Sequence, residues 1–155
     1  MDKTYYITTP IYYPSAKPHM GHAYSSIIAD FFARFKKIDD YKVHFLTGTD
    51  EHGLKIQRSA EKAGKEPLVF CDQISQTFRD LSNTLNLSNT DFIRTTEARH
   101  KKTVQHLWNE LEKNDDIYLS NYSGWYSVSD EAFYNEDEIE EVDGKKISIS
   151  SKSPV

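Results

Sequence analysis

Short β-like runs alternate with longer helical patterns over most of this 155-residue chain. Residues 5–8 and 43–47 are rich in β-branched and aromatic side chains, which favour strands. Between them, apolar residues recur at three- and four-residue steps as one stripe of a helix: Met20, Ala23, Ile27, Phe31, Phe35 and Ile38. This alternation predicts an α/β fold, a Rossmann-like doubly wound sheet with parallel strands.

The remaining patterns divide the chain into two predicted domains. Helices are expected over 54–63, before Gly64, over 67–85, with Pro67 in the first turn, and over 97–113, with a strand over 91–95. Beyond Asp116 only short β-like pieces follow, at 117–121, 125–128 and 147–150, separated by polar turns. We therefore expect a nucleotide-binding domain over 1–115 and a small β-rich insertion over 116–155.

Charge and cysteine content exclude several classes of protein. The net charge is −5 and the pI about 5.7, which argues against a dedicated nucleic-acid binder but leaves room for RNA held by a local basic patch. Cys71 is the single cysteine, so the sequence has no internal disulfide and no Cys-rich zinc site. The sequence shows no signal-peptide pattern and no apolar run of membrane-spanning length, so we expect a cytoplasmic protein without a membrane partner.

The segment PIYYPSAKPHMGH, residues 10–22, connects the first predicted strand to the first predicted helix. A helix start offers unpaired N–H groups and a positive dipole end, which suit an anion such as a phosphate. Gly21 allows close backbone approach, and His19 and His22 add two ring donors to the same region. Two other interpretations of the His-x-x-His spacing stay open here, a helix cap and one half of a zinc site.

The segment TGTDEHG, residues 47–53, follows the second predicted strand, at the edge of the sheet where ligands bind in such folds. Asp50 could pair with an ammonium group through a charge-assisted hydrogen bond. The alternative is a surface acidic turn in which Asp50 or Glu51 completes the first turn of the next helix.

Both segments resemble one family. PHMGH resembles the His-Ile-Gly-His signature of class I aminoacyl-tRNA synthetases, with Met20 in place of isoleucine. The wider ITTPIYYPSAKPHMGHAYS and the TGTDEHG segment resemble methionyl-tRNA synthetases. The resemblance implies an enzyme that activates methionine with ATP, with Mg²⁺ expected alongside the ATP, and transfers it to tRNA(Met).

The resemblance also implies roles for individual residues. His19 and His22 would be catalytic by stabilising charge on the ATP phosphates, without a covalent intermediate. The implied ATP-binding set is Tyr12, His19, Gly21 and His22, and the implied methionine-binding set is Pro10, Ile11, Tyr13 and Asp50. Tyr12 could equally be a packing residue, and His52 could be a hydrogen-bonding scaffold residue.

Residues 118–134 resemble the start of the connective insertion that lies over the active site in this family. Many relatives carry a Cys-x-x-Cys zinc knuckle there, and the matching positions here are Ser127 and Asp130. Without two thiolates a structural zinc site is not expected, so the resemblance implies a zinc-free form.

The resemblance covers residues 5–155 but only the first portion of the family's length. The second half of the nucleotide fold, its Lys-Met-Ser-Lys-Ser loop and the anticodon-reading domain are not in this sequence, so we expect this piece alone to be inactive or nearly so. A small nucleotidyltransferase and a non-catalytic nucleotide-binding module are the alternatives. The basic run 99–102 could touch RNA or be a solvated face, and the sequence does not specify the oligomeric state.

Overall fold

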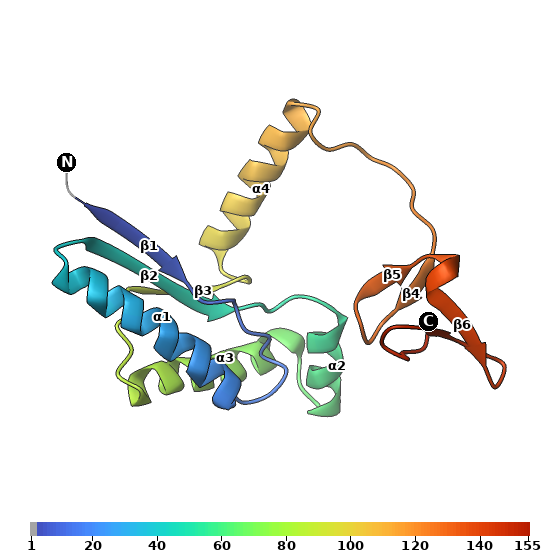
Figure 1. The fold of residues 1–155 in the computed structure, drawn as a ribbon, viewed down its shortest axis with the longest axis horizontal. Coiled ribbons are helices and arrows are strands. Elements are labelled where there is room, and N and C mark those ends of the chain that lie inside the picture. Colours follow the sequence, from blue (N-terminus) through green and yellow to red (C-terminus); the bar gives the residue numbers. More distant parts are fainter. Residues whose placement is uncertain (1–2) are drawn as a thin grey trace. The chain divides into compact units, whose positions relative to one another are not determined.

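The computed structural model describes residues 3–155, which form two compact units, one ending at Leu107 and the other beginning at Trp108. The first contains β1 (Thr4–Thr8), α1 (Met20–Ile38), β2 (Lys42–Thr49), α2 (Leu54–Lys62), α3 (Pro67–Thr84) and β3 (Asp91–Arg94), as Figure 1 shows. Helix α4 (Ala98–Lys113) runs across the division. The predicted alternation of strands and helices is confirmed.

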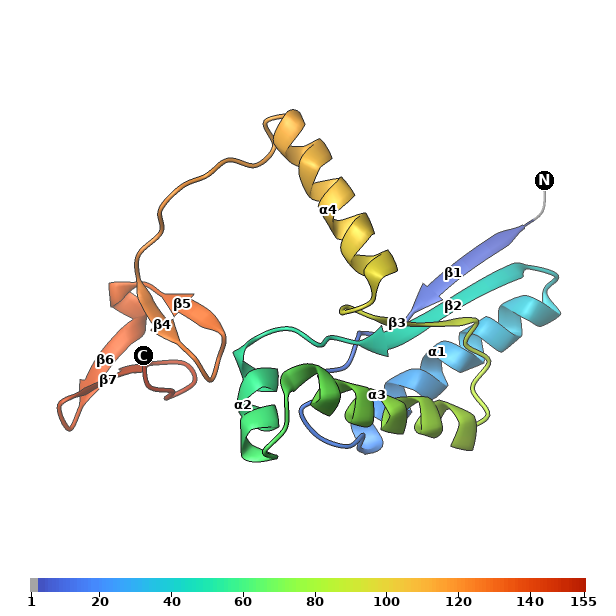
Figure 2. The same ribbon diagram turned by 180° about the vertical axis from the view of Figure 1, so that it is seen from behind.

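The three strands form one parallel sheet in the order β1-β2-β3. Thr8 of β1 pairs with Leu46 of β2, and Thr49 of β2 pairs with Arg94 of β3. Helices α1 and α3 lie on the same face of this sheet in both views (Figures 1 and 2). The order 3-2-1 is the first half of the arrangement that defines the Rossmann fold, and it confirms the predicted fold class.

Helix α1 packs on the sheet through a face of small residues. The buried positions are Ala23, Ser26, Ala29, Asp30 and Ala33, and the core there joins Ala29 and Ala33 to Phe45 of β2. The large residues of the stripe noted in the sequence are exposed, Phe31 by 63% and Ile38 by 83%. Small side chains occupy the face of α1 that packs on the sheet, because they let the helix backbone come close to the strands. Among the described residues, no helix combines the length and apolar character needed to cross a membrane.

Gly48 permits the close pairing of β2 with β3. A Cβ atom at this position would lie 2.0 Å from the carbonyl oxygen of Ile93, a backbone atom that cannot move away cheaply. The second sequence segment therefore needs its glycine for strand packing, directly before the residues that reach the edge of the sheet.

After the end of α4, the second unit contains two small antiparallel hairpins. Strand β4 (Trp125–Ser127) pairs with β5 (Ala132–Tyr134), and after the turn η1 (Glu136–Glu138) strand β6 (Ile139–Val142) pairs with β7 (Lys145–Ser148). The predicted strands at 125–128 and 147–150 are confirmed with shorter or shifted bounds. The predicted strand at 117–121 is wrong, because this segment has no strand partner and Leu119 is fully exposed.

Candidate active site

The loop after β1 continues to pair with β2 and so brings both sequence segments together. The Tyr12 N–H donates to the Gly48 carbonyl at 3.0 Å, and the Asp50 N–H donates to the Tyr12 carbonyl at 2.9 Å. Tyr12 and Thr49 form a parallel bridge beyond the ends of the regular pairing. Asp50 is therefore held beside the loop that leads to the histidines.

His19 and His22 cap the start of α1 through a reciprocal pair of hydrogen bonds. The Gly21 N–H donates to Nδ1 of His19 at 3.0 Å, and the His19 N–H donates to Nδ1 of His22 at 3.1 Å. This is the geometry of a capping box, with imidazole nitrogens replacing the usual hydroxyl and carboxylate oxygens. The two rings are stacked with centroids 3.8 Å apart. The capping interpretation of the His-x-x-His spacing is therefore correct.

This cap fixes which ring nitrogens carry protons. A nitrogen that accepts a hydrogen bond has no proton, so each neutral ring must hold its proton on Nε2. Nε2 is the nitrogen that the cap does not use, and it remains able to donate. The positive end of the α1 dipole lies at the same place. Capping and anion binding are therefore compatible, because they use opposite nitrogens of the same rings.

The histidines border a cleft of about 320 Å³. Its lining comprises Ile11, Tyr12, Tyr13, Ser15, Ala16, Lys17, His19 and His22. Ile11 and Tyr13 are about 40% exposed, whereas Tyr12 is almost completely buried. Of the other expected site residues, Pro10, Gly21 and Asp50 lie in the adjoining segments and do not line this cleft. Lys17 adds a basic side chain that no sequence pattern indicated.

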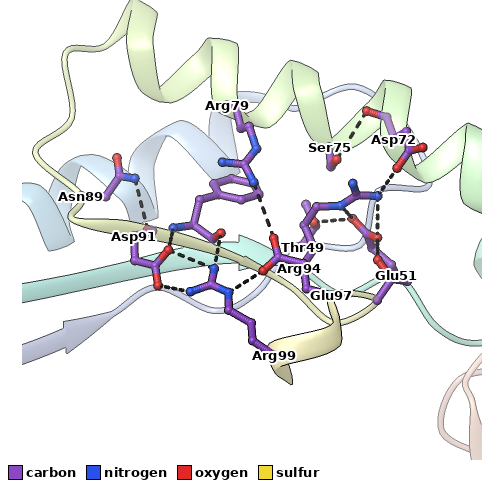
Figure 3. Close-up of polar contacts among 12 residues, drawn as sticks. Thr49, Glu51, Asp72, Ser75, Arg79, Asn89, Asp91, Arg94, Glu97 and Arg99 are labelled. Carbon is purple, nitrogen blue, oxygen red and sulfur yellow. Dashed lines mark hydrogen bonds and ion pairs between the residues drawn. The ribbon is translucent and has the colours of Figure 1, made fainter. Parts of the chain in front are cut away.

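Glu51, which the sequence offered only as an alternative helix-turn residue, is the centre of a buried ion pair. Its carboxylate accepts hydrogen bonds from Arg94 at 2.7 and 2.9 Å, from Thr49 at 2.7 Å and from Thr96 at 2.5 Å. Arg94 also reaches Asp72 at 2.6 Å (Figure 3). Burial alone would raise the pKa of Glu51, but the bonds from Arg94, Thr96 and Thr49 lower it. Glu51 is therefore a structural anion that ties the loop after β2 to β3.

His52 and the basic run 99–102, whose roles the sequence left open, also contact other parts of the fold. A His52 ring nitrogen lies 3.2 Å from the Thr95 carbonyl oxygen, as expected for a scaffold residue. Arg99 makes a bidentate pair with Asp91, at 2.6 and 3.0 Å, and bonds Glu97 at 2.5 Å (Figure 3). Arg99 thus anchors the start of α4 to β3.

Comparison with known proteins assigns this arrangement to a family. The model of the class I tRNA synthetases of the M type matches residues 5–146. A mitochondrial methionine–tRNA ligase of Takifugu rubripes is 51% identical over 98% of this chain, and a methionine–tRNA ligase of Listeria monocytogenes is 50% identical over 97%. This chain covers only 26% and 23% of those two proteins.

Solved structures agree with this assignment. The crystal structure of a Mycobacterium tuberculosis methionyl-tRNA synthetase bound by methionyl-adenylate superposes with a TM-score of 0.91 at 48% identity, covering 98% of this chain and 30% of that one. A leucyl enzyme of Agrobacterium radiobacter, in a ternary complex, shares the fold with a TM-score of 0.73 at 21% identity, covering 99% of this chain and 20% of that one. The fold and the signature turn are those of class I tRNA synthetases. Within that class, the chain belongs to the methionyl-tRNA synthetase family, and the resemblance seen in the sequence is confirmed.

The first prediction concerns the charge of the histidine pair. Burial and then the neighbouring His19 lower the pKa of His22 below 6.5. The stability that the neutral His22 ring contributes is therefore complete above about pH 6.5 and is lost as the pH falls through the lower folded value. His19→Asn removes the neighbouring charge and keeps an N-cap acceptor. NMR titration of the full-length protein should show the His22 pKa rising towards 6.5 in this variant, and an unchanged or lower value would contradict the coupling.

Proposed function

We propose that this chain is part of the catalytic domain of a methionine–tRNA ligase, with residues 1–115 in the nucleotide-binding domain and 116–155 in the connective insertion. In the reaction, the methionine carboxylate attacks the α-phosphorus of ATP and pyrophosphate leaves. A terminal ribose hydroxyl of tRNA(Met) then takes the methionyl group and AMP is released. The observation that supports this proposal best is the capped histidine pair, which leaves two Nε2–H donors at a helix N-terminus beside a cleft.

The proposed roles of the histidines follow from their geometry. Negative charge shifts onto the phosphate oxygens as pyrophosphate leaves, and preorganised N–H donors at the positive end of a helix stabilise it. His19 and His22 do not move to provide these donors, because their Nδ1 atoms are already fixed by the backbone. Gly21 keeps this turn open to the phosphates, since a side chain there would press on the His19 ring at 2.9 Å.

Two of the proposed methionine-binding residues, Ile11 and Tyr13, line the same cleft as the histidines. Pro10, Ile11 and Tyr13 offer apolar and aromatic surface, and a thioether packs favourably against an aromatic ring. Asp50 follows β2 and would pair with the methionine ammonium group. These assignments rest on the resemblance, together with the hydrogen bond that holds Asp50 to Tyr12.

Two metal ions bear on this proposal, because Mg²⁺ is expected with ATP and zinc occurs in many relatives. Residues 3–155 contain no cluster of three or more His, Cys, Asp or Glu side chains suited to a metal ion. The expected Mg²⁺ would therefore be held mainly by the ATP phosphates. Structural zinc does not fit Ser127 and Asp130, because a hydroxyl group is a poor zinc ligand compared with thiolate or imidazole. A cytoplasmic location and the tRNA contact remain predictions.

The function is tested by methionine-dependent exchange of pyrophosphate into ATP, measured on the full-length protein with each of several amino acids. Methionine alone should support rapid exchange. His22→Ala should lower the exchange rate by roughly 10²–10³-fold, the range for losing one preorganised donor, with methionine binding nearly unchanged. Exchange near the wild-type rate in the variant would contradict the role of His22, and no exchange in the wild type would favour a non-catalytic module.

Asp50→Asn tests the amino-acid pocket. An ammonium–carboxylate contact exists equally in free methionine and in the adenylate, so its loss weakens binding rather than the chemical step. Methionine affinity should fall by roughly 2–4 kcal/mol with ATP affinity nearly unchanged. Calorimetry of the full-length protein measures both, with Asp40→Asn in the exposed turn after α1 as the control. Loss of ATP binding with intact methionine binding would assign Asp50 to the nucleotide side.

A further inference from the structure

Tyr12 reaches the first turns of α1 from the loop after β1. Its side chain is 8% exposed, and its hydroxyl lies 3.0 Å from the Oγ atoms of both Ser25 and Ser26. The hydroxyl also lies 3.3 Å from the carbonyl oxygen of His22, to which it can donate. A phenol has one donor and two acceptor positions, and its three hydrogen-bonding neighbours all belong to α1.

The ring and backbone of Tyr12 make three further connections. The ring meets His22 edge-on with centroids 4.8 Å apart and stacks on Phe78 of α3 at 5.5 Å. Its N–H donates to the Gly48 carbonyl in β2, and its carbonyl accepts from the N–H of Asp50, directly after β2. Tyr12 therefore contacts the histidine turn, the Asp50 segment and α3, and it is the largest member of the buried cluster there.

We propose that Tyr12 is a positioning residue that sets the placement of His22 relative to Asp50, and that it acts through this placement rather than as an ATP ligand. Its hydroxyl is hydrogen-bonded to residues of α1, so the group by which a tyrosine would bind a phosphate or ribose already has partners within the protein. Its backbone N–H is hydrogen-bonded to β2. This proposal rests on the proposed function, because it concerns the two residues assigned there to ATP and to methionine.

Tyr12→Phe tests this proposal in the full-length protein, since it removes the hydroxyl and keeps the ring. The kcat of pyrophosphate exchange should fall about 3- to 10-fold, the effect of losing one hydrogen bond that orients a catalytic group, with the KM for ATP within about twofold of wild type. Ser26→Ala should have a similar but smaller effect. The fold-reduction of kcat in the double variant should be smaller than the product of the two single reductions, because both changes break the same contact.

Two other outcomes would overturn the positioning role. A raised KM for ATP at unchanged kcat would make Tyr12 a direct ATP ligand, and unchanged kinetics with reduced thermal stability would make it a packing residue only. The His22 ring signals, followed by NMR, should also shift in Tyr12→Phe. This last readout does not depend on activity, so it tests the positioning even if the wild type proves not to activate methionine.

The second unit contains two turns in which a buried serine hydroxyl accepts a backbone N–H. In the first, the Asp130 N–H donates to Ser127 Oγ at 3.4 Å, and in the second the Ser151 N–H donates to Ser148 Oγ at 3.3 Å. Ser127 and Ser148 are completely buried. The turns belong to different hairpins, which share no strand pairing among the described residues.

The Asp130 carboxylate joins these turns. It accepts hydrogen bonds from Ser151 at 2.5 Å and Ser153 at 2.7 Å in the second turn, and from Tyr134 of its own hairpin at 2.8 Å. The bonds from Ser151 and Ser153, followed by those from Tyr134 and Ser127, lower the pKa of Asp130 to about 2. The carboxylate is therefore ionised at any physiological pH.

We infer that Asp130 cross-links the two hairpins, so that a carboxylate with hydroxyl donors does here the structural work that a metal ion does in a cysteine knuckle. Charge-assisted hydrogen bonds are the strongest kind available to such a small unit, which has little apolar core. This inference does not depend on the catalytic function.

Hydrogen exchange of the full-length protein tests the cross-link. Asp130→Asn should speed amide exchange over residues 145–153 by about tenfold or more, with residues 4–49 unchanged, because an amide accepts fewer of these bonds. Ser153→Ala should have a milder effect, and Asp137→Asn, in the exposed turn η1, should have none. Treatment with EDTA should change nothing. Unchanged exchange in both Asp130→Asn and Ser153→Ala, or loss of protection with EDTA, would overturn the inference.

Discussion

The parallel pairing of β2 with β1 on one side and β3 on the other determines where every proposed site residue lies. Because the three strands run in one direction, the segments that follow them reach the same edge of the sheet. The bridge between Tyr12 and Thr49 prolongs this pairing past the end of β1. Gly48 makes the close pairing of β2 with β3 sterically possible, and the ion pair of Glu51 with Arg94 fixes the segment after β2 to β3.

The histidine turn caps α1, and this cap is compatible with the proposed phosphate binding that the sequence presented as an alternative. The reciprocal cap satisfies backbone N–H groups at the start of α1, which would otherwise lack partners. The same two bonds place the ring protons on Nε2 of His19 and His22. A residue that caps a helix with one nitrogen can thus bind a phosphate with the other, and the rigid backbone provides the preorganisation that transition-state stabilisation requires.

Local patterns predicted the strands and helices of the first unit and the two segments at the edge of its sheet, because periodicity and turn chemistry act over a few residues. They did not predict contacts between distant residues. Glu51 meets Arg94 across 43 positions, and no local feature distinguishes it from its neighbour Asp50. The Asp130 carboxylate meets Ser153 across 23 positions, and it depends on serine hydroxyls, which form no distinctive sequence pattern. The inner face of α1 was missed because small residues, rather than the larger apolar ones, allow close packing on the sheet.

The central claim is that His19 and His22 form a single unit that caps α1 through Nδ1 and donates through Nε2. The direct test is ¹⁵N NMR of the histidine side chains in the full-length protein, well above the ordinary imidazole pKa, where both rings are neutral. Our account predicts that both residues are protonated on Nε2 alone, without exchange between tautomers. A proton on Nδ1 of either ring, or a mixture of tautomers averaged as in free histidine, would contradict it.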